Sequence, residues 1–433
     1  MKRKITDILI AWKDNPKRKP LIINGARQVG KTYIIKKFGE DYFDNVVYIN
    51  FETNLSVGDF FEDDISPQRI IRFLEVMADT KIVAGKSLII FDEIQASNRA
   101  LTSLKVFFEE APEYHIIAAG SLLGVAVNRE KFSFPVGKVS QINMYPLDFE
   151  EFIWALKKEA LSNEIRSHFE TLNEMPSPLH AQAIEYFKYY LIVGGMPEAV
   201  QDFANTQSFM NVAEIQSNIS TQYLADMSKY AETAMSVKIR ACYNSIPAQL
   251  AKENKKFQYK IVQKGGTASI FGEAIEWLHS AGIILPCQKI DHGFIPISAY
   301  VDLSDFKMYM SDTGLLTQKS GMPIQTILSE IEADNIFLGA LYENFVAQSL
   351  TANEIPLYYW KNENTAEVDF VIQQGENVIP VEVKKGNRTR SISMRMFATK
   401  YQSPYSIRIS KKNFGFENGI KSIPHYATFC ITI

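Results

Sequence analysis

A glycine-rich segment near the amino terminus has the residue types and the spacing of a phosphate-binding loop. Residues 25–32 read GARQVGKT and fit the pattern G-x-x-x-x-G-K-[ST] at every fixed position. In such a loop, backbone N–H groups surround phosphate oxygens, and the N-terminus of the following helix adds a favourable dipole. We expect Lys31 to reach the β- and γ-phosphates and the Thr32 hydroxyl to ligate magnesium. The expected ligands are ATP, or a close relative, and Mg2+, and the expected contact residues are Gly25, Ala26, Arg27, Gln28, Val29, Gly30, Lys31 and Thr32.

Two acidic residues end an apolar run further along the chain. Leu88–Phe91 is suited to a strand that is buried on both faces, and Asp92 and Glu93 follow it. At the C-terminal end of such a strand, we expect Asp92 to hold magnesium and Glu93 to polarise the attacking water. Ser121 follows a second run, His115–Ala119, and is expected to sense the γ-phosphate; a plain helix cap is the alternative for this serine.

A third set of reactive residues lies near the carboxyl terminus. Asp369 is followed, 13 positions later, by Glu382 and then by Lys384. Residues two apart in a strand share a face, so Glu382 and Lys384 should project together. Two carboxylates beside a lysine suit Mg2+ or Mn2+ that activates water against a phosphodiester, with Glu343 as a further ligand. The alternative is an exposed charged strand face, because the pattern E-x-K is short.

The elements that must position the first two groups alternate between strand and helix. Such alternation, from Leu21 to about Leu147, predicts a parallel sheet covered on both faces. A helix is expected over Thr32–Phe38, with Gly39 ending it, and another begins at Ser66-Pro67, a cap followed by a proline. The expected strands are Leu21–Ile23, Val46–Phe51, Leu88–Phe91, His115–Ala119 and Lys138–Met144.

The pattern changes twice in the rest of the chain, and the domain boundaries expected from these changes are 1–147, 148–233, 234–323 and 324–433. The second region is helical, with amphipathic stretches at Glu151–Ala160 and Ala181–Tyr190. The third should hold a helix at Ser269–Ser280 and strands at Ile283–Leu285 and Phe294–Ile297. The fourth should hold a helix and three strands, at Leu341–Leu350, Leu357–Trp360, Glu367–Ile372 and Val378–Val383.

Bulk composition narrows the class of protein. A net charge of −3 argues against a surface that is basic throughout, although a local basic groove is compatible with it. Three scattered cysteines without paired or metal-type spacing indicate reduced thiols in the cytoplasm. The longest apolar stretch, Ile116–Val127, is shorter than the roughly 20 residues that cross a bilayer. We therefore expect a soluble, cytoplasmic protein without membrane contact.

These motifs, with several later stretches, resemble a bacterial and archaeal family of AAA+-type ATPases whose C-terminal half is a domain of unknown function. The matching stretches are NGARQVGKT, LIIFDEIQ, AAGSLLG, MYPLDFEEF, YLIVGGMPEAV and LYENFVAQSL…VDFVI…VIPVEVKKG. The resemblance implies an α/β P-loop core of the additional-strand type, a helical lid, a winged-helix-like region and a C-terminal domain related to restriction endonucleases. It also implies Glu93 as the catalytic glutamate and Ser121 as a sensor.

The chain departs from that family at one informative place. Related proteins often have Gly-Arg just before the "PL" motif, whereas this chain has Gly137-Lys138. An arginine finger is therefore unassigned. Arg129, Arg99 and an arginine from a partner chain in a homo-oligomer are the candidates.

Two hypotheses about function stay open from the sequence. The first is an ATPase that couples ATP turnover to nucleic-acid binding and cleavage, with Lys260, Lys264 and the helix Ser269–Ser280 contacting DNA as in a winged helix. The structural alternative to DNA contact is that this region serves as a packing or oligomerisation module. The second hypothesis is an ATP-driven regulatory switch whose nuclease-like domain only binds a partner.

Overall fold

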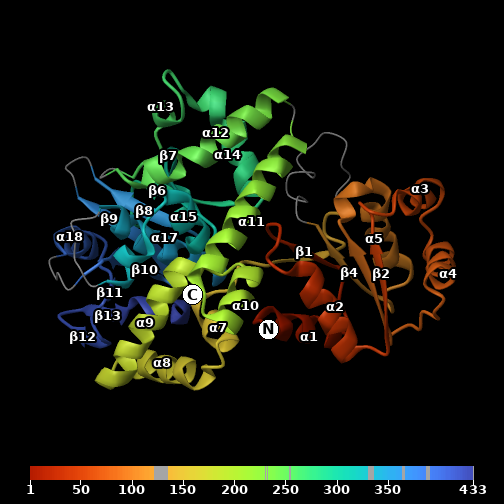
Figure 1. Ribbon diagram of the computed structural model, residues 1–433, viewed down its shortest axis with the longest axis horizontal. Coiled ribbons are helices and arrows are strands. Elements are labelled where there is room, and N and C mark those ends of the chain that lie inside the picture. The colour runs from red at the N-terminus through yellow and green to blue at the C-terminus, as the bar shows by residue number, and fades with distance from the viewer. Residues whose placement is uncertain are drawn as a thin grey trace. The chain divides into compact units, whose positions relative to one another are not determined.

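The computed structural model describes residues 1–120, 135–229, 231, 233–252, 255–329, 336–362, 366–386 and 391–432. The chain divides into two compact units (Figure 1). The amino-terminal unit comprises Lys2–Tyr145 with Ser280–Gly282, and the carboxyl-terminal unit comprises Pro146–His279 with Ile283–Ile433. The finer division into four domains stays a prediction.

The amino-terminal unit is built on a five-stranded parallel sheet with the strand order β2-β3-β4-β1-β5. Strand β4 lies between β1, which leads into the glycine-rich loop, and β3, which ends at Asp92. This is the additional-strand arrangement, so the expected α/β fold class is confirmed. The strands are β1 (Leu21–Asn24), β2 (Asn45–Asn50), β3 (Ser87–Asp92), β4 (His115–Ala119) and β5 (Ser140–Asn143).

Helices cover both faces of this sheet because successive strand residues point to opposite sides and both sets are apolar. The helices are α1 (Ile5–Asp14), α2 (Lys31–Tyr42), α3 (Leu55–Asp63), α4 (Pro67–Ala78) and α5 (Asn98–Glu110). Ile23 and Ile90 join the core cluster that α1 and α2 complete. Ile22 and Ile89 join the cluster that α3, α4 and α5 complete. Burial on both sides explains the unbroken apolar runs in the sequence.

Helix α2 is longer than expected. It continues to Tyr42, so the prediction that Gly39 ends it is wrong. Gly39 lies inside the helix where α2 passes close to β2, and a Cβ at this position would lie 2.5 Å from Val46 Cγ2. The glycine permits this close approach rather than ending the helix.

The carboxyl-terminal unit begins with helices (Figure 1). The expected amphipathic stretch Glu151–Ala160 is wrong as a single helix, because α7 ends at Ala155 and α8 begins at Glu159. The helices before the sheet are α7 (Phe149–Ala155), α8 (Glu159–Thr171), α9 (Ser177–Val193), α10 (Pro197–Thr206), α11 (Phe209–Lys229), α12 (Thr233–Leu250), α13 (Tyr259–Val262) and α14 (Ala268–Ser280).

An eight-stranded mixed sheet follows, in the order β12-β13-β11-β10-β9-β8-β6-β7. Its strands are β6 (Ile284–Ile290), β7 (Val301–Met310), β8 (Tyr358–Lys361), β9 (Glu367–Gln374), β10 (Asn377–Val383), β11 (Ser406–Ser410), β12 (Gly415–Glu417) and β13 (Ile420–Pro424). Helix α17 (Ile336–Ala352) precedes β8, and α18 (Ile392–Lys400) connects β10 to the parallel strand β11. The three strands expected after residue 356 are confirmed.

The hairpin of β6 and β7 belongs to this sheet. Strand β6 pairs antiparallel with β7 and parallel with β8, although nearly 70 residues separate β6 from β8. The prediction of a strand at Phe294–Ile297 is wrong, because these residues lie in the connection and a 3-10 turn follows at Ile297–Tyr300. The second strand of the hairpin is β7.

Asp312 is fully buried before α15 (Thr313–Ser320) and joins that helix to the turn between α9 and α10. Its carboxylate accepts hydrogen bonds from the N–H groups of Gly195 (2.6 Å) and Leu315 (2.8 Å). Burial raises the pKa of Asp312 to about 6, although the hydrogen bonds from these two donors act to lower it. Leu147 donates its N–H to the Gly195 carbonyl at 2.7 Å. The PLDFEEF and GGMPEAV stretches thus contact each other within this unit.

In the described parts of the chain, no helix is both long and apolar enough to cross a membrane. All three cysteines, Cys242, Cys287 and Cys430, are buried free thiols, as their spacing predicts.

We expect Gly194→Ala to destabilise the carboxyl-terminal unit by about 3 kcal/mol in denaturant unfolding. A Cβ at Gly194 would lie 2.3 Å from Asp312 Oδ1, and the backbone there (φ 69°, ψ −160°) is one that only glycine adopts readily. Gly321→Ala is the matched control, since Gly321 has the same φ of 69° but no atom within 4 Å of the added Cβ. It should cost about 1 kcal/mol. Equal losses in the two variants would contradict the role given to Asp312.

Candidate functional site

The glycine-rich loop joins β1 to the N-terminus of α2, as the sequence predicts. Gly25 faces the chain beyond β5 so closely that a Cβ would lie 2.2 Å from the Met144 carbonyl oxygen. The loop then passes through positive φ at Gln28 (65°) and at Gly30 (93°), which is the N-cap of α2. The loop backbone therefore meets the start of a 12-residue helix, where N–H groups and the helix dipole favour an anion.

Other side chains of the loop fix its position. Ala26 and Val29 are buried in the core cluster of α1 and α2. The Arg27 guanidinium lies 3.4 Å from the Glu52 carboxylate, in the connection after β2. These contacts position the loop against the rest of the amino-terminal unit.

Lys31 is almost completely buried in the first turn of α2. Its Nζ donates to the carbonyl oxygens of Gly25 and Ala26, both at 2.7 Å. Burial lowers the pKa of Lys31 to about 8, although the carboxylates of Glu93 and Asp92 oppose this shift. The ammonium group thus lies within the loop that would hold the phosphates.

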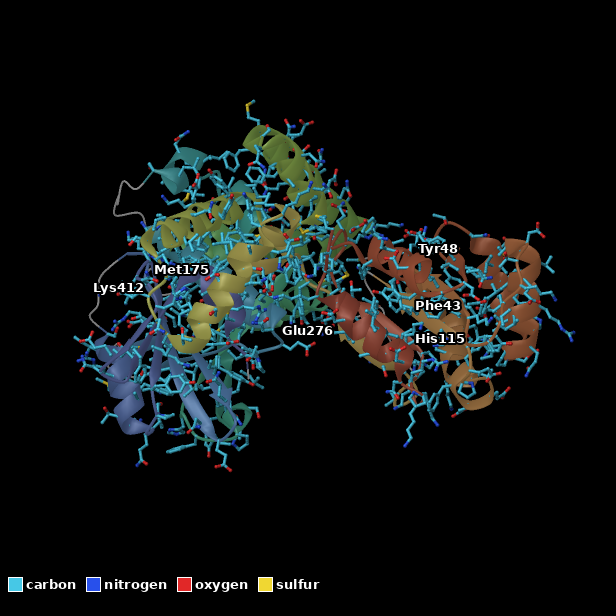
Figure 2. All side chains as sticks on the ribbon, turned by 90° about the horizontal axis from the view of Figure 1, so that it is seen from below. Phe43, Tyr48, His115, Met175, Glu276 and Lys412 are labelled. Atoms are coloured by element: carbon cyan, nitrogen blue, oxygen red, sulfur yellow. The ribbon has the colours of Figure 1, made fainter. Side chains whose placement is uncertain are left out.

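Asp92 brings three elements together at the end of β3. Its Oδ2 accepts one hydrogen bond from Thr32 Oγ1 and one from the Tyr48 hydroxyl, each 2.8 Å long. The sequence predicts that Thr32 and Asp92 act on one magnesium ion, but it gives no role to Tyr48, a residue of strand β2 that is labelled in Figure 2. Burial raises the pKa of Tyr48 to about 12, so its hydroxyl remains a donor to the carboxylate.

Glu93 follows with a left-handed backbone, φ 49°. Its Oε2 accepts a hydrogen bond of 2.5 Å from Gln95 Nε2. Gln95 is a second residue that the sequence did not single out. It holds the carboxylate that is expected to act on water.

The expected sensor and arginine residues are only partly placed. Ser121 and Arg129 lie outside the described residues. Arg99 lies on α5 and acts electrostatically on Asp64, a residue just before α4. Lys138, which stands where related proteins often have arginine, forms a 2.9 Å ion pair with Glu109 of the same unit.

The carboxyl-terminal candidate residues gather at the ends of β9 and β10. Lys384 Nζ lies 2.7 Å from Glu382 Oε1, and Asp369 Oδ2 accepts a 2.8 Å hydrogen bond from the Val383 N–H. The pKa of Lys384 is raised overall. Burial lowers this pKa, but the carboxylates of Glu382, Asp369 and Glu343 raise it by a larger amount. Glu382 is buried, which excludes the alternative of an exposed charged face at this residue.

Two lysines that the sequence did not single out enter the same cluster. Lys255 forms an ion pair with Glu343 Oε1, while Glu343 Oε2 accepts a 3.2 Å hydrogen bond from the Tyr309 hydroxyl. Lys307, on β7, is 1% exposed and lies 2.6 Å from Glu367 Oε1. Burial lowers the pKa of Lys307, but the carboxylates of Glu367, Glu343 and Asp369 raise it by a larger amount. The pKa is therefore raised overall, and the lysine stays charged. Burial and Glu343 raise the pKa of Asp369.

The geometry does not assemble a metal site at this cluster. Within the described ranges, no group of three or more His, Cys, Asp or Glu side chains is arranged to hold a metal ion. The expected ligands Asp369, Glu382 and Glu343 are near one another but interact with lysines or the backbone.

Helix α14 presents an acidic outer face. Its Ile275 and Leu278 are buried, as expected for residues that face a core. Its exposed residues include Glu273 and Glu276, the latter labelled in Figure 2. Two glutamates on the outer face of a helix do not favour its entry into a DNA groove, because DNA is itself anionic.

Three segments of the chain match known families. Residues 17–153 match a family described as an AAA domain. Residues 184–326 match a domain of unknown function (DUF8612), and residues 338–427 match another (DUF4143). Most of the amino-terminal unit therefore matches an AAA domain, and the regions that follow it match two domains of unknown function.

Individual relatives match only a part of the chain or match it at low sequence identity. Over 92 residues the chain is 36% identical to "Uncharacterized protein Rv2008c" of Mycobacterium tuberculosis and to "Uncharacterized protein Mb2031c" of Mycobacterium bovis. The matched segment is 21% of this chain and only 20% of each relative. The Walker-type ATPase paby2304 of Pyrococcus abyssi is 14% identical at a TM-score of 0.45, covering 73% of this chain and 95% of its own. The ORC1 protein of Aeropyrum pernix, solved in complex with DNA, is 11% identical at a TM-score of 0.29, and the match covers 76% of this chain and 93% of that protein.

We expect the affinity for ATP to fall about tenfold for each pH unit above 8. The pKa of Lys31 is lowered to about 8, so its positive charge is present below that pH and is lost as the pH rises through it. Binding above pH 8 should also take up a proton, which titration calorimetry in buffers of different ionisation enthalpy measures. Lys31→Arg is the control, because arginine stays charged and its profile should be flat. A wild-type affinity that is unchanged from about pH 7 to about pH 9.5 would contradict the prediction.

Proposed function

We propose that the amino-terminal unit binds ATP and hydrolyses it with Mg2+. One observation carries the proposal: Thr32 Oγ1 and Asp92 Oδ2 meet at 2.8 Å, directly after the glycine-rich loop. A hydroxyl and a carboxylate are hard oxygen donors of the kind that Mg2+ prefers, and the ion needs few protein donors because it keeps several waters. The loop and the start of α2 supply the phosphate site.

The roles of the neighbouring residues follow from their positions. Lys31 would exchange the carbonyl oxygens of its own loop for the β- and γ-phosphates. Glu93 would orient the attacking water and accept its proton after release from Gln95. Thr32 and Asp92 would hold Mg2+, and the bound ion would neutralise charge on the phosphates. Ser121 is proposed as the sensor on its sequence position alone.

An arginine finger would come from a second copy of the chain. The observation that favours this is the ion pair between Lys138 and Glu109, which already engages the cation at the family's usual arginine position. This makes a homo-oligomer part of the proposal.

A second proposed function is nucleic-acid binding, with metal-dependent cleavage as its stronger form. The favouring observation is that Asp369, Glu382, Lys384 and Glu343 are near enough to influence one another's charge. The order of elements in this region is also the one that a restriction-endonuclease-like fold requires: α17, β8, β9, β10, α18 and β11. Lys260 and Lys264 are exposed and could contact phosphates, whereas the acidic face of α14 could not. The alternative remains a regulatory switch whose carboxyl-terminal fold only binds a partner.

We expect Lys31→Ala to abolish tight ATP binding, since the γ-phosphate charge would be left without its cation. We expect Glu93→Gln to retain binding but to lower turnover by about 100-fold or more. Calorimetry measures the first effect and phosphate release the second. Lys37→Ala is the control, because Lys37 lies nearly two turns further along α2, is half exposed and pairs at the surface with Asp41. Normal ATP binding by Lys31→Ala would remove the P-loop assignment.

Nucleic-acid binding should weaken steeply with salt, and the Lys260→Ala/Lys264→Ala double variant should reduce the salt slope by about two. Gel-shift assays on single- and double-stranded DNA and RNA, with and without Mn2+ and ATP, read binding and cleavage together. The exposed Lys81 of the amino-terminal unit provides the control substitution. Asp369→Asn should stop cleavage without changing ATP turnover. If the wild type binds no nucleic acid at low salt, the regulatory switch becomes the better proposal.

A further inference from the structure

Arg3 is a buried arginine that lies just before α1 and contacts the glycine-rich loop. Its guanidinium donates one hydrogen bond to the Val29 carbonyl, from Nη1 at 3.1 Å, and one to the Tyr145 carbonyl, from Nη2 at 2.7 Å. Arg3 is only 8% exposed, and a guanidinium so far from water requires hydrogen-bond acceptors inside the protein. Three segments that are distant in the sequence therefore meet at this side chain: the residues before α1, the loop, and the chain that follows β5.

The backbone of Arg3 is held by helix α1, which starts two residues later. The Arg3 carbonyl accepts a hydrogen bond from the Thr6 N–H at 3.2 Å. Helix α1 lies beside α2 in the amino-terminal unit (Figure 1), and Leu9 of α1 belongs to the same buried core cluster as Val29 of the loop. The guanidinium is therefore presented to the loop from a packed part of the unit.

The hydrogen bond to Val29 determines how one peptide unit of the loop is turned. The peptide bond between Val29 and Gly30 is trans, and the C=O and N–H groups of a trans peptide point in opposite directions. The Gly30 N–H therefore points away from the Arg3 guanidinium. Gly30 has a φ of 93°, and because glycine adopts positive and negative φ with equal ease, this peptide could otherwise rotate and reverse the two groups. Arg3 opposes the rotation, since the rotation would break a hydrogen bond from a buried charged donor.

We propose that Arg3 is a positioning residue of the phosphate loop: by holding the Val29 carbonyl, it keeps the Gly30 N–H directed at the phosphates of ATP. This inference rests on the first proposed function, whose phosphate site it concerns. The second hydrogen bond, to Tyr145, keeps the guanidinium oriented for the first. Without Arg3, ATP would have to select the correct orientation of this peptide, because a carbonyl oxygen in place of the N–H would repel the phosphate charge. That selection weakens binding but not the chemical step that follows it.

The test measures ATP and ADP binding by calorimetry, and ATP turnover by phosphate release, in the full chain. Arg3→Ala should raise both the Kd and the KM for ATP by about tenfold or more, the effect of losing a hydrogen bond from a charged donor. Its kcat should change by less than about threefold, because bound ATP draws the Gly30 N–H back to the phosphates. The Kd for ADP should rise by the same factor, since the N–H groups of such a loop contact phosphates that ATP and ADP share.

Arg18→Ala is the matched control. Arg18 also donates to two backbone carbonyls, those of Pro112 and Glu113, but these residues precede β4 and lie at the opposite edge of the parallel sheet from the loop. Its KM for ATP should match that of the wild type. Arg3→Lys keeps the charge but lacks the fork that reaches both carbonyls, so its KM should lie between those of the wild type and Arg3→Ala.

Circular dichroism without nucleotide establishes that each variant is folded, and if Arg3→Ala is not, the KM of Arg3→Lys decides alone. A folded Arg3→Ala that binds ATP as tightly as the wild type would overturn the inference and leave the ATPase proposal intact. A wild-type KM for Arg3→Lys would overturn it as well when Arg3→Ala does not fold. A fall in kcat as large as the rise in KM would also overturn it, since Arg3 would then act on the chemical step. If the wild type binds no ATP, the ATPase proposal fails and this inference fails with it.

Discussion

A buried carboxylate must find its donors or counter-charges inside the protein, and this constraint shapes every functional region of the chain. Asp92, Asp312 and Glu343 are each less than a tenth exposed, yet each is matched by a different kind of partner. Asp92 accepts from two hydroxyls, Asp312 from backbone N–H groups and Glu343 from a lysine and a tyrosine. The nature of the partner decides what the carboxylate can do next.

Hydroxyl partners leave a carboxylate ready for a metal, because Thr32 can turn a lone pair toward a cation without a change of charge. Backbone partners fix the carboxylate permanently, since the N–H groups of Gly195 and Leu315 are part of the fold around Asp312. Lysine partners oppose a metal electrostatically, as at Glu343. Buried carboxylates thus accept from hydroxyl groups in the amino-terminal unit, from backbone N–H groups at Asp312 and from a lysine and a tyrosine at Glu343.

The sequence predicted what is encoded locally. Apolar runs gave the five strands of the first sheet, and the motif GARQVGKT gave the loop between β1 and α2 with Thr32 near Asp92. The contacts it could not predict are made over long separations. Lys255 meets Glu343 across 88 positions, and Tyr48 meets Asp92 across 44. Lys307 did carry a local signal, a lysine inside the apolar strand segment FKMYM, where a charged side chain must find a buried partner. The failure at Gly39 has the opposite cause, because tertiary packing against β2 overrode a local rule about helix ends.

Both candidate sites hold their charged groups on internal partners that a ligand has to replace. Lys31 donates to carbonyl oxygens of its own loop, and Glu93 accepts from Gln95. A phosphate would compete for Lys31 with far more charge than a carbonyl can offer, so ATP can displace those bonds without help. Gln95 is a neutral donor to a charged acceptor and has to give up one hydrogen bond, which is a modest barrier. Lys255 is different in kind, because its removal would leave the buried carboxylate of Glu343 without its counter-charge. Any change that moves the segment between α12 and α13 would therefore act on Glu343 through this one side chain.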